Sequence, residues 1–132
     1  KYIITGNKRD INRYRWGHQN IINKLKDKNS KQSIFYKSIT NLLEIRRKQK
    51  AFHPNGLRSY INFGPKIFGF KRQSLDKRQI IICVTNLSSK NQFPKINKNY
   101  IHWKNLINSN KKIKKTKYLQ LKPFETMWLS NI

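Results

Sequence analysis

The chain has 132 residues, and 30 lysines and arginines against five aspartates and glutamates give a formal net charge of +25. This length suits one domain with a modest core. The single cysteine, Cys83, excludes an internal disulfide framework and is expected to be an inert core thiol. No stretch approaches the roughly 18 apolar residues of a membrane helix. Histidines lie far apart and carboxylates are few, so we predict no metal site and no cofactor.

The positive charge has two competing explanations. It usually indicates a nucleic-acid or anionic-membrane partner. However, Lys, Asn and Ile have A/T-rich codons and number 22, 16 and 18, while Arg numbers only eight, which is typical of mutational drift. We therefore expect only non-specific, salt-dependent binding to polyanions. The alternative is a basic β-rich nucleic-acid-binding module, in which Tyr60, Phe68 and Phe70 stack bases.

Near the start of the chain, Lys8–Trp16 holds four cations, one carboxylate, one amide and two aromatic side chains in nine residues. No helical or strand period runs through it, and Gly6 before it marks a turn. We interpret it as a substrate-facing loop, and a solvated basic surface loop is the alternative. Because the chain begins with Lys1 rather than Met, we expect it to be a piece of a longer protein.

Two helices are predicted after this loop. Residues 18–27 place apolar side chains at helical spacing, and Asn29 or Ser30 is suited to cap the next helix. Residues 31–49 form the clearest helix, and its wide apolar stripe must dock against a larger body. Pro54 and Gly56 then end the helical pattern. The stripe contains Ile34, Phe35, Ile39, Leu42, Leu43 and Ile45.

Beyond Gly56, short alternating runs separated by turn residues predict β-strands. Phe68 and Phe70 should share one face of their strand, and residues 73–78 suit a hairpin turn. Residues 108–116 form a predicted Lys-rich loop. The fold class predicted is α+β, a helix followed by a small antiparallel β-sandwich. The expected strands are 57–63, 67–72, 79–86, 93–96, 102–107, 118–121 and 125–129.

Catalytic chemistry is not evident in the chain. There is no Gly-rich phosphate loop and no nucleophile elbow. We predict that His53 is buried at a domain junction rather than catalytic. The carboxylates lie on different predicted elements, so none suggests the acid and base pair of glycoside chemistry. They are Asp10, Asp27, Glu44, Asp76 and Glu125.

Seven stretches match the motifs of a known family in the same order. They are Arg9–Arg13, Leu42–Lys50, Ala51–Gly56, Ile67–Ser74, Val84–Ser88, Trp103–Ile107 and Leu121–Leu129. Together they resemble the C-terminal part of sucrose-phosphorylase-type sugar phosphorylases, which belong to the α-amylase clan of glycoside hydrolases. This branch includes sucrose, sucrose 6'-phosphate and glucosylglycerate phosphorylases.

The resemblance implies an architecture in which a (β/α)8 barrel precedes a β-sandwich. Residues 1–52 would be the end of the barrel, with its last loop and last helix, and residues 57–132 would be the C-terminal β-sandwich domain. The missing N-terminal barrel would be the chain's partner. A cytoplasmic protein is expected. A non-functional gene remnant is a further alternative.

The resemblance also implies a retaining mechanism, in which one carboxylate attacks the anomeric carbon, a second protonates the leaving oxygen and phosphate accepts the glucosyl group. In the family these carboxylates lie on earlier barrel strands, so this chain would hold no catalytic residue. Arg13 matches a family arginine that contacts the sugar or the phosphate, which a guanidinium fork suits. Arg9, Asp10 and Asn12 would fix the loop or contact the sugar. Tyr14 stands where the family often has His.

Overall fold

The computed structural model describes residues 6, 16–100, 102–108 and 117–132. The chain divides into two compact units, Lys1–Asn41 and Leu42–Ile132. The predicted substrate loop and the predicted Lys-rich loop fall mainly on residues 7–15 and 109–116, which lie outside the described residues. The predicted domain boundary at residues 52–57 stays a prediction.

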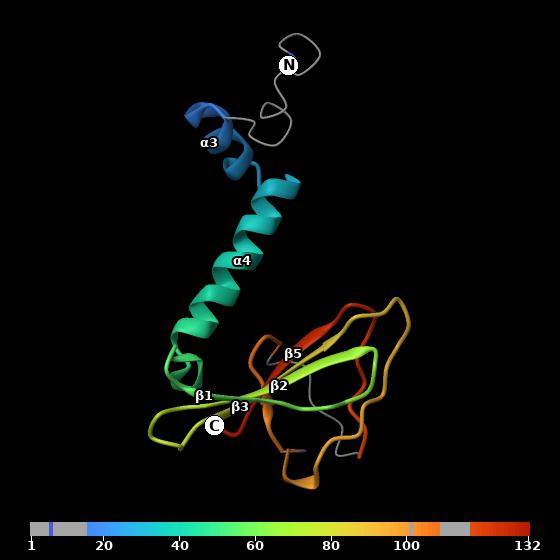
Figure 1. The fold of residues 1–132 in the computed structure, drawn as a ribbon. Coiled ribbons are helices and arrows are strands. Elements are labelled where there is room, and N and C mark those ends of the chain that lie inside the picture. The colour runs from blue at the N-terminus through green and yellow to red at the C-terminus, as the bar shows by residue number, and fades with distance from the viewer. Residues whose placement is uncertain (1–5, 7–15, 101, 109–116) are drawn as a thin grey trace. The chain divides into compact units, whose positions relative to one another are not determined.

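Both predicted helices are confirmed (Figure 1). Helix α3 spans His18–Lys26, and helix α4 spans Lys31–Arg47. Ser30 caps α4 as expected, because its Oγ accepts a hydrogen bond of 3.1 Å from the Ser33 N–H. The same Oγ donates to the carbonyl of Lys24, which ties the end of α3 to the start of α4. Among the described residues, no helix has the length and apolar character to cross a membrane.

Helix α4 has the predicted apolar residues but buries none of its 17 side chains. Phe35 is 69% exposed and Leu43 is 58% exposed. These are large apolar surfaces for a helix of a water-soluble fold to leave uncovered. The apolar stripe therefore has no covering partner among the described residues. The exposed large side chains of α4 are Ile34, Phe35, Tyr36, Ile39 and Leu43.

The second unit contains an antiparallel sheet with the strand order β1-β2-β3-β5-β4. A 3-10 turn, η1 (Lys50–Phe52), precedes the sheet, and a second, η2 (Lys98–Tyr100), lies before β4. The predicted β2–β3 hairpin is present, with Lys77 at the positive φ of 59° in its turn. The strands are β1 Leu57–Tyr60, β2 Ile67–Gln73, β3 Ile80–Asn86, β4 Lys104–Asn105 and β5 Thr126–Ser130.

One face of the sheet carries the main core. Strand β3 lies at its centre and presents Ile82 and Val84, beside Met127 and Leu129 of β5. Buried apolar residues from two further segments, 92–96 and 118–121, cover this face. They are Ile96, Leu119 and Leu121.

The segments covering the core only partly match the predicted sandwich. Isolated bridges join Gln92 to Leu121 and Lys95 to Tyr118, rather than a continuous ladder. Pro94 lies between the two bridged positions and has no N–H to donate, which helps to keep the pairing short. The antiparallel sheet is confirmed, and its cover consists of two bridged segments in the part of the chain described.

The opposite face of the sheet holds a smaller core. Ile81 and Cys83 of β3 pack there with Ala51, and Phe52 and Trp128 lie against them. The ring centroids of Phe52 and Trp128 are 4.9 Å apart. Burial disfavours the thiolate and raises the pKa of Cys83 to about 12. The expected core position of Cys83 is confirmed, and a raised pKa keeps its thiol in the less reactive protonated form.

Candidate functional site

The residues predicted to contact substrate are Arg13, Arg9, Asp10 and Asn12. All four fall within residues 7–15, outside the described residues. Their roles stay predictions. The described chain resumes at Trp16, immediately before α3.

The junction segment, residues 48–56, connects α4 to β1 and makes several polar contacts with other residues of the second unit. Its centre is Ala51, which is fully buried. The Ala51 N–H donates to Gln79 Oε1 at 2.9 Å, and Arg72 Nε donates to the Ala51 carbonyl at 3.2 Å. Arg72 also donates to the His53 carbonyl. The side chains of Gln79 and Arg72 therefore provide hydrogen-bond partners for backbone groups of this turn.

Gly56 ends the junction segment because no larger residue fits there. A Cβ at this position would lie 2.8 Å from the Gln73 carbonyl oxygen and 3.2 Å from that of Ala51. The Gly56 N–H donates to the His53 carbonyl at 2.9 Å, which closes the turn before β1. This close approach of backbone accounts for a glycine at position 56, whereas α4 already ends at Arg47.

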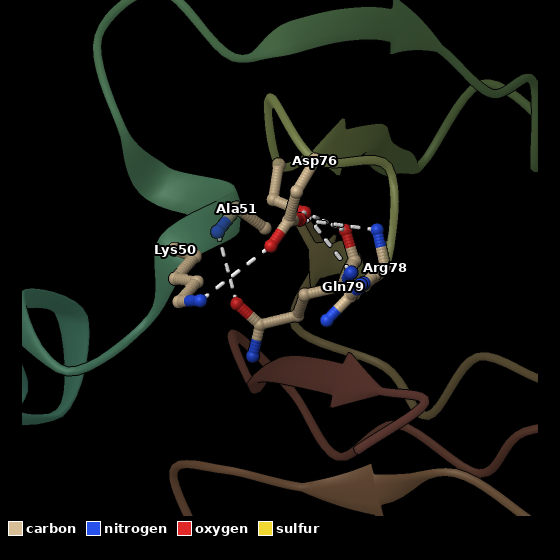
Figure 2. A network of polar contacts seen from close by, with 6 residues as sticks. Lys50, Ala51, Asp76, Arg78 and Gln79 are labelled. Atoms are coloured by element: carbon tan, nitrogen blue, oxygen red, sulfur yellow. Dashed lines mark hydrogen bonds and ion pairs between the residues drawn. The ribbon is translucent and has the colours of Figure 1, made fainter.

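A second set of contacts joins the junction segment to the β2–β3 turn (Figure 2). Lys50 Nζ lies 3.5 Å from Asp76 Oδ2. Asp76 also accepts hydrogen bonds from the Ser74 hydroxyl and, at 3.1 Å, from the Arg78 N–H. These bonds to the ionised form, first that of Ser74 and then that of Arg78, lower the pKa of Asp76, and the Lys50 charge adds to them.

A pocket of about 470 Å³ opens beside this turn. His53 lines it but is exposed rather than buried, so the burial predicted for it is wrong. The backbone carbonyl of His53 accepts a hydrogen bond from Arg72, and the His53 Nδ1 accepts one from the Asn55 N–H at 3.2 Å. Ser74, the hydroxyl in the lining, is engaged with Asp76 and Gln79. The cationic lining residues are Arg46, Arg47, Lys48 and Lys50.

Three of the four described carboxylates bond within local turns, and the fourth, Glu44, lies in α4. Asp27 Oδ1 accepts from the Asn29 N–H at 3.0 Å, and Glu125 Oε2 accepts from the Lys122 N–H at 2.8 Å. Asp76 has the turn role given above. Within the described ranges, no group of three or more His, Cys, Asp or Glu could hold a metal ion.

The surface of β1 and β2 forms a second pocket, of about 300 Å³. We call it the aromatic face, and define it as Arg58, Tyr60, Phe68, Phe70 and Arg72. The antiparallel register pairs Arg58 with Arg72 and Tyr60 with Phe70. The ring centroids of Tyr60 and Phe68 are 6.2 Å apart, and those of Phe68 and Phe70 are 5.6 Å apart. The prediction that Phe68 and Phe70 share a face is confirmed.

The chain is similar to part of one known enzyme in sequence and to parts of several solved enzymes in structure. No family model matches the chain. It is 30% identical over 84 residues to the glucosylglycerate phosphorylase of Spirochaeta thermophila. The aligned region covers 64% of this chain and 14% of that protein. The trehalulose synthase MutB from Pseudomonas mesoacidophila MX-45 is structurally similar, with a TM-score of 0.58, 15% identity, and coverage of 83% of this chain and 19% of the synthase.

A family GH13_31 enzyme gives a TM-score of 0.54 and 21% identity, over 85% of this chain and 18% of that enzyme. At these identities the solved structures establish the shared fold. The chain spans only about one seventh of the length of its phosphorylase relative. The resemblance seen in the sequence motifs is confirmed: the chain is homologous to part of a sugar phosphorylase and has the fold of a part of α-amylase-clan enzymes.

Proposed function

We propose that the chain is the C-terminal part of a retaining glucosyl phosphorylase. The whole enzyme would transfer a glucosyl group from sucrose, sucrose 6'-phosphate or glucosylglycerate to inorganic phosphate, giving glucose 1-phosphate in the cytoplasm. The observation that carries this proposal is the 30% identity over 84 residues to a glucosylglycerate phosphorylase. The order of the seven motifs along the chain supports it.

The uncovered helix α4 supports the same proposal. Burying one large apolar side chain contributes roughly 1.5–3 kcal/mol, so leaving several exposed favours a covering body. In the proposed enzyme, α4 is the last helix of the barrel, and the missing barrel helices and strands cover Phe35, Ile39 and Leu43. Residues 1–52 then complete the barrel, and residues 57–132 form the C-terminal β-sandwich domain.

The chemistry in this proposal is divided between two parts of the enzyme. The nucleophilic carboxylate and the acid lie on the missing barrel strands, so residues 1–132 alone should be inactive. Barrel active sites lie at the C-terminal ends of the strands, where the loop after the last strand reaches the rim. Arg13 contacts the sugar or the phosphate there, and Arg9, Asp10 and Asn12 hold the loop or contact the sugar.

A chimaera tests this proposal. Residues 1–132 replace the matching C-terminal part of the Spirochaeta thermophila phosphorylase, and glucose 1-phosphate release from glucosylglycerate and phosphate is measured. We expect activity from the chimaera and none from residues 1–132 alone. Arg13→Ala in the chimaera should lower kcat/KM about 100-fold, because a preorganised cation at the transferred group is lost. Arg13→Lys should fall between, since it keeps charge without the fork.

Lys28→Ala is the control, because it removes one positive charge at an exposed position outside the predicted substrate loop. It should leave kcat/KM within about threefold of the unsubstituted chimaera. A chimaera that folds but releases no glucose 1-phosphate would contradict the assignment. Turnover by residues 1–132 alone would contradict the proposed location of the catalytic carboxylates.

A further inference from the structure

The aromatic face has a surface chemistry that the phosphorylase reaction does not use. Tyr60 is 84% exposed and Phe68 is 44% exposed, although both lie on strands of an ordered sheet. Strand pairing sets Tyr60 directly opposite Phe70, and Phe68 lies diagonally beside them. Three adjacent rings on one sheet face are an arrangement on which flat, unsaturated groups can stack.

The charge of this face is uniform. The residues that line its pocket include two of the chain's eight arginines and no carboxylate. Arg72 is held in place by its hydrogen bonds to the carbonyls of Ala51 and His53. Arg58 is exposed on the edge strand β1. A second copy of the chain would bring like charges together here, so the complementary occupant is an anion with flat rings.

We propose that the aromatic face binds single-stranded nucleic acid. One or two unpaired bases stack on Tyr60 and Phe68, and Arg58 pairs with a backbone phosphate. Stacking accepts any base, because every base presents a π-face, and an arginine adds cation–π and phosphate contacts. A duplex keeps its bases stacked on one another and offers only its phosphates, so this face distinguishes single strands from duplexes.

All residues of the proposed contact are present in residues 1–132, so the test uses this chain. The probe is a labelled oligothymidylate of about 12 nucleotides, titrated by fluorescence anisotropy at about 0.15 M salt. Tyr60→Ala and Phe68→Ala should each raise Kd about tenfold. Arg58→Ala should weaken binding and lower the slope of log Kd against log salt by about one.

Phe93→Ala is the matched control, since Phe93 is 57% exposed and lies outside the aromatic face. It should leave Kd unchanged, and Tyr60→Phe, which keeps the ring, should also bind normally. Circular dichroism checks that each variant is folded. As a second measurement on the unsubstituted chain, photocrosslinking to a 5-iodouracil oligonucleotide should label peptide 57–70.

The proposal is overturned if the single strand and a duplex of the same sequence bind equally well and the two alanine variants bind as the unsubstituted chain does. That result would assign all binding to the net charge of +25. Absence of binding at this salt, or crosslinks confined to other peptides, would overturn it as well. None of these results affects the chimaera experiment, so the two proposals fail separately.

Discussion

Helix α4 and strand β3 are both rich in apolar residues, but they differ completely in burial. None of the 17 residues of α4 is buried, whereas five of the seven in β3 are. Strand β3 has neighbours on both edges and packing on both faces, so the sheet unit closes its own core. The sheet therefore closes its own core, and the exposure of α4 fits the proposal that this helix belongs to a core completed by other residues.

Thiol labelling should show this difference most strongly. Cys83 lies in β3 at 2% exposure, while Phe35 of α4 is 69% exposed. We expect Cys83 to react with a maleimide at pH 7 at least about 1,000-fold more slowly than the cysteine placed by Phe35→Cys, because Cys83 reacts only after the sheet opens. Mass spectrometry of timed aliquots measures both rates.

Both cysteines can be compared in one variant, since each falls on a different peptide. Labelling in denaturant is the control, and there the two rates should agree. Rapid labelling of Cys83 under native conditions would show that the sheet unit does not hold its core alone. Slow labelling at position 35 would show that something in the isolated chain covers α4.

Periodicity predicted the regular elements of this molecule. Helical spacing of apolar residues gave α4, and the run Ile80–Val84 gave the central strand, because burial leaves a repeat in the sequence. The strands near Pro94 and at His102–Ile107 were less predictable. They reduce to isolated bridges and to the two residues of β4, since tertiary packing rather than local pattern sets their length.

The polar contacts are harder to predict from the sequence than the helices and strands. Arg72 and Gln79 bond to Ala51 from 21 and 28 residues away, and no local pattern marks a side chain that will reach a distant backbone group. The position of His53 at the junction predicts that it is buried, but its side chain is exposed and its backbone carbonyl bonds to Arg72. The candidate substrate residue Arg13 rests on family resemblance, which periodicity does not supply.

Gln79→Ala should give the next largest effect, because it removes the acceptor of the buried Ala51 N–H. It also removes the Gln79 Nε2 donor, which lies 2.7 Å from Gln49 Oε1. An unsatisfied buried donor costs about 1–3 kcal/mol, so we expect a loss of that size in the free energy of unfolding. Urea denaturation followed by tryptophan fluorescence measures it.

Gln120→Ala is the matched control for this substitution, since Gln120 is exposed. It should change the free energy of unfolding by less than about 0.5 kcal/mol. Equal effects of the two substitutions would mean that the Gln79 contacts do not fasten the junction segment. A loss of stability seen only with Gln79→Ala would show that the turn after α4 unfolds together with the sheet.

The smallest expected effect concerns Asp76, which lies in the β2–β3 turn and contacts Lys50 of the junction segment. Its pKa is lowered in the folded state, so its contribution to stability is present above the ordinary value of 3.8 and is lost as the pH falls through the folded value. Asp76→Asn should therefore lower Tm near neutral pH, and the two Tm curves should converge as the pH falls from about 5 to about 2. Parallel curves would show that Asp76 does not stabilise the turn through its charge. Lys50→Gln should reproduce only a minor part of the effect, because the Ser74 and Arg78 hydrogen bonds lower this pKa more than the Lys50 charge does.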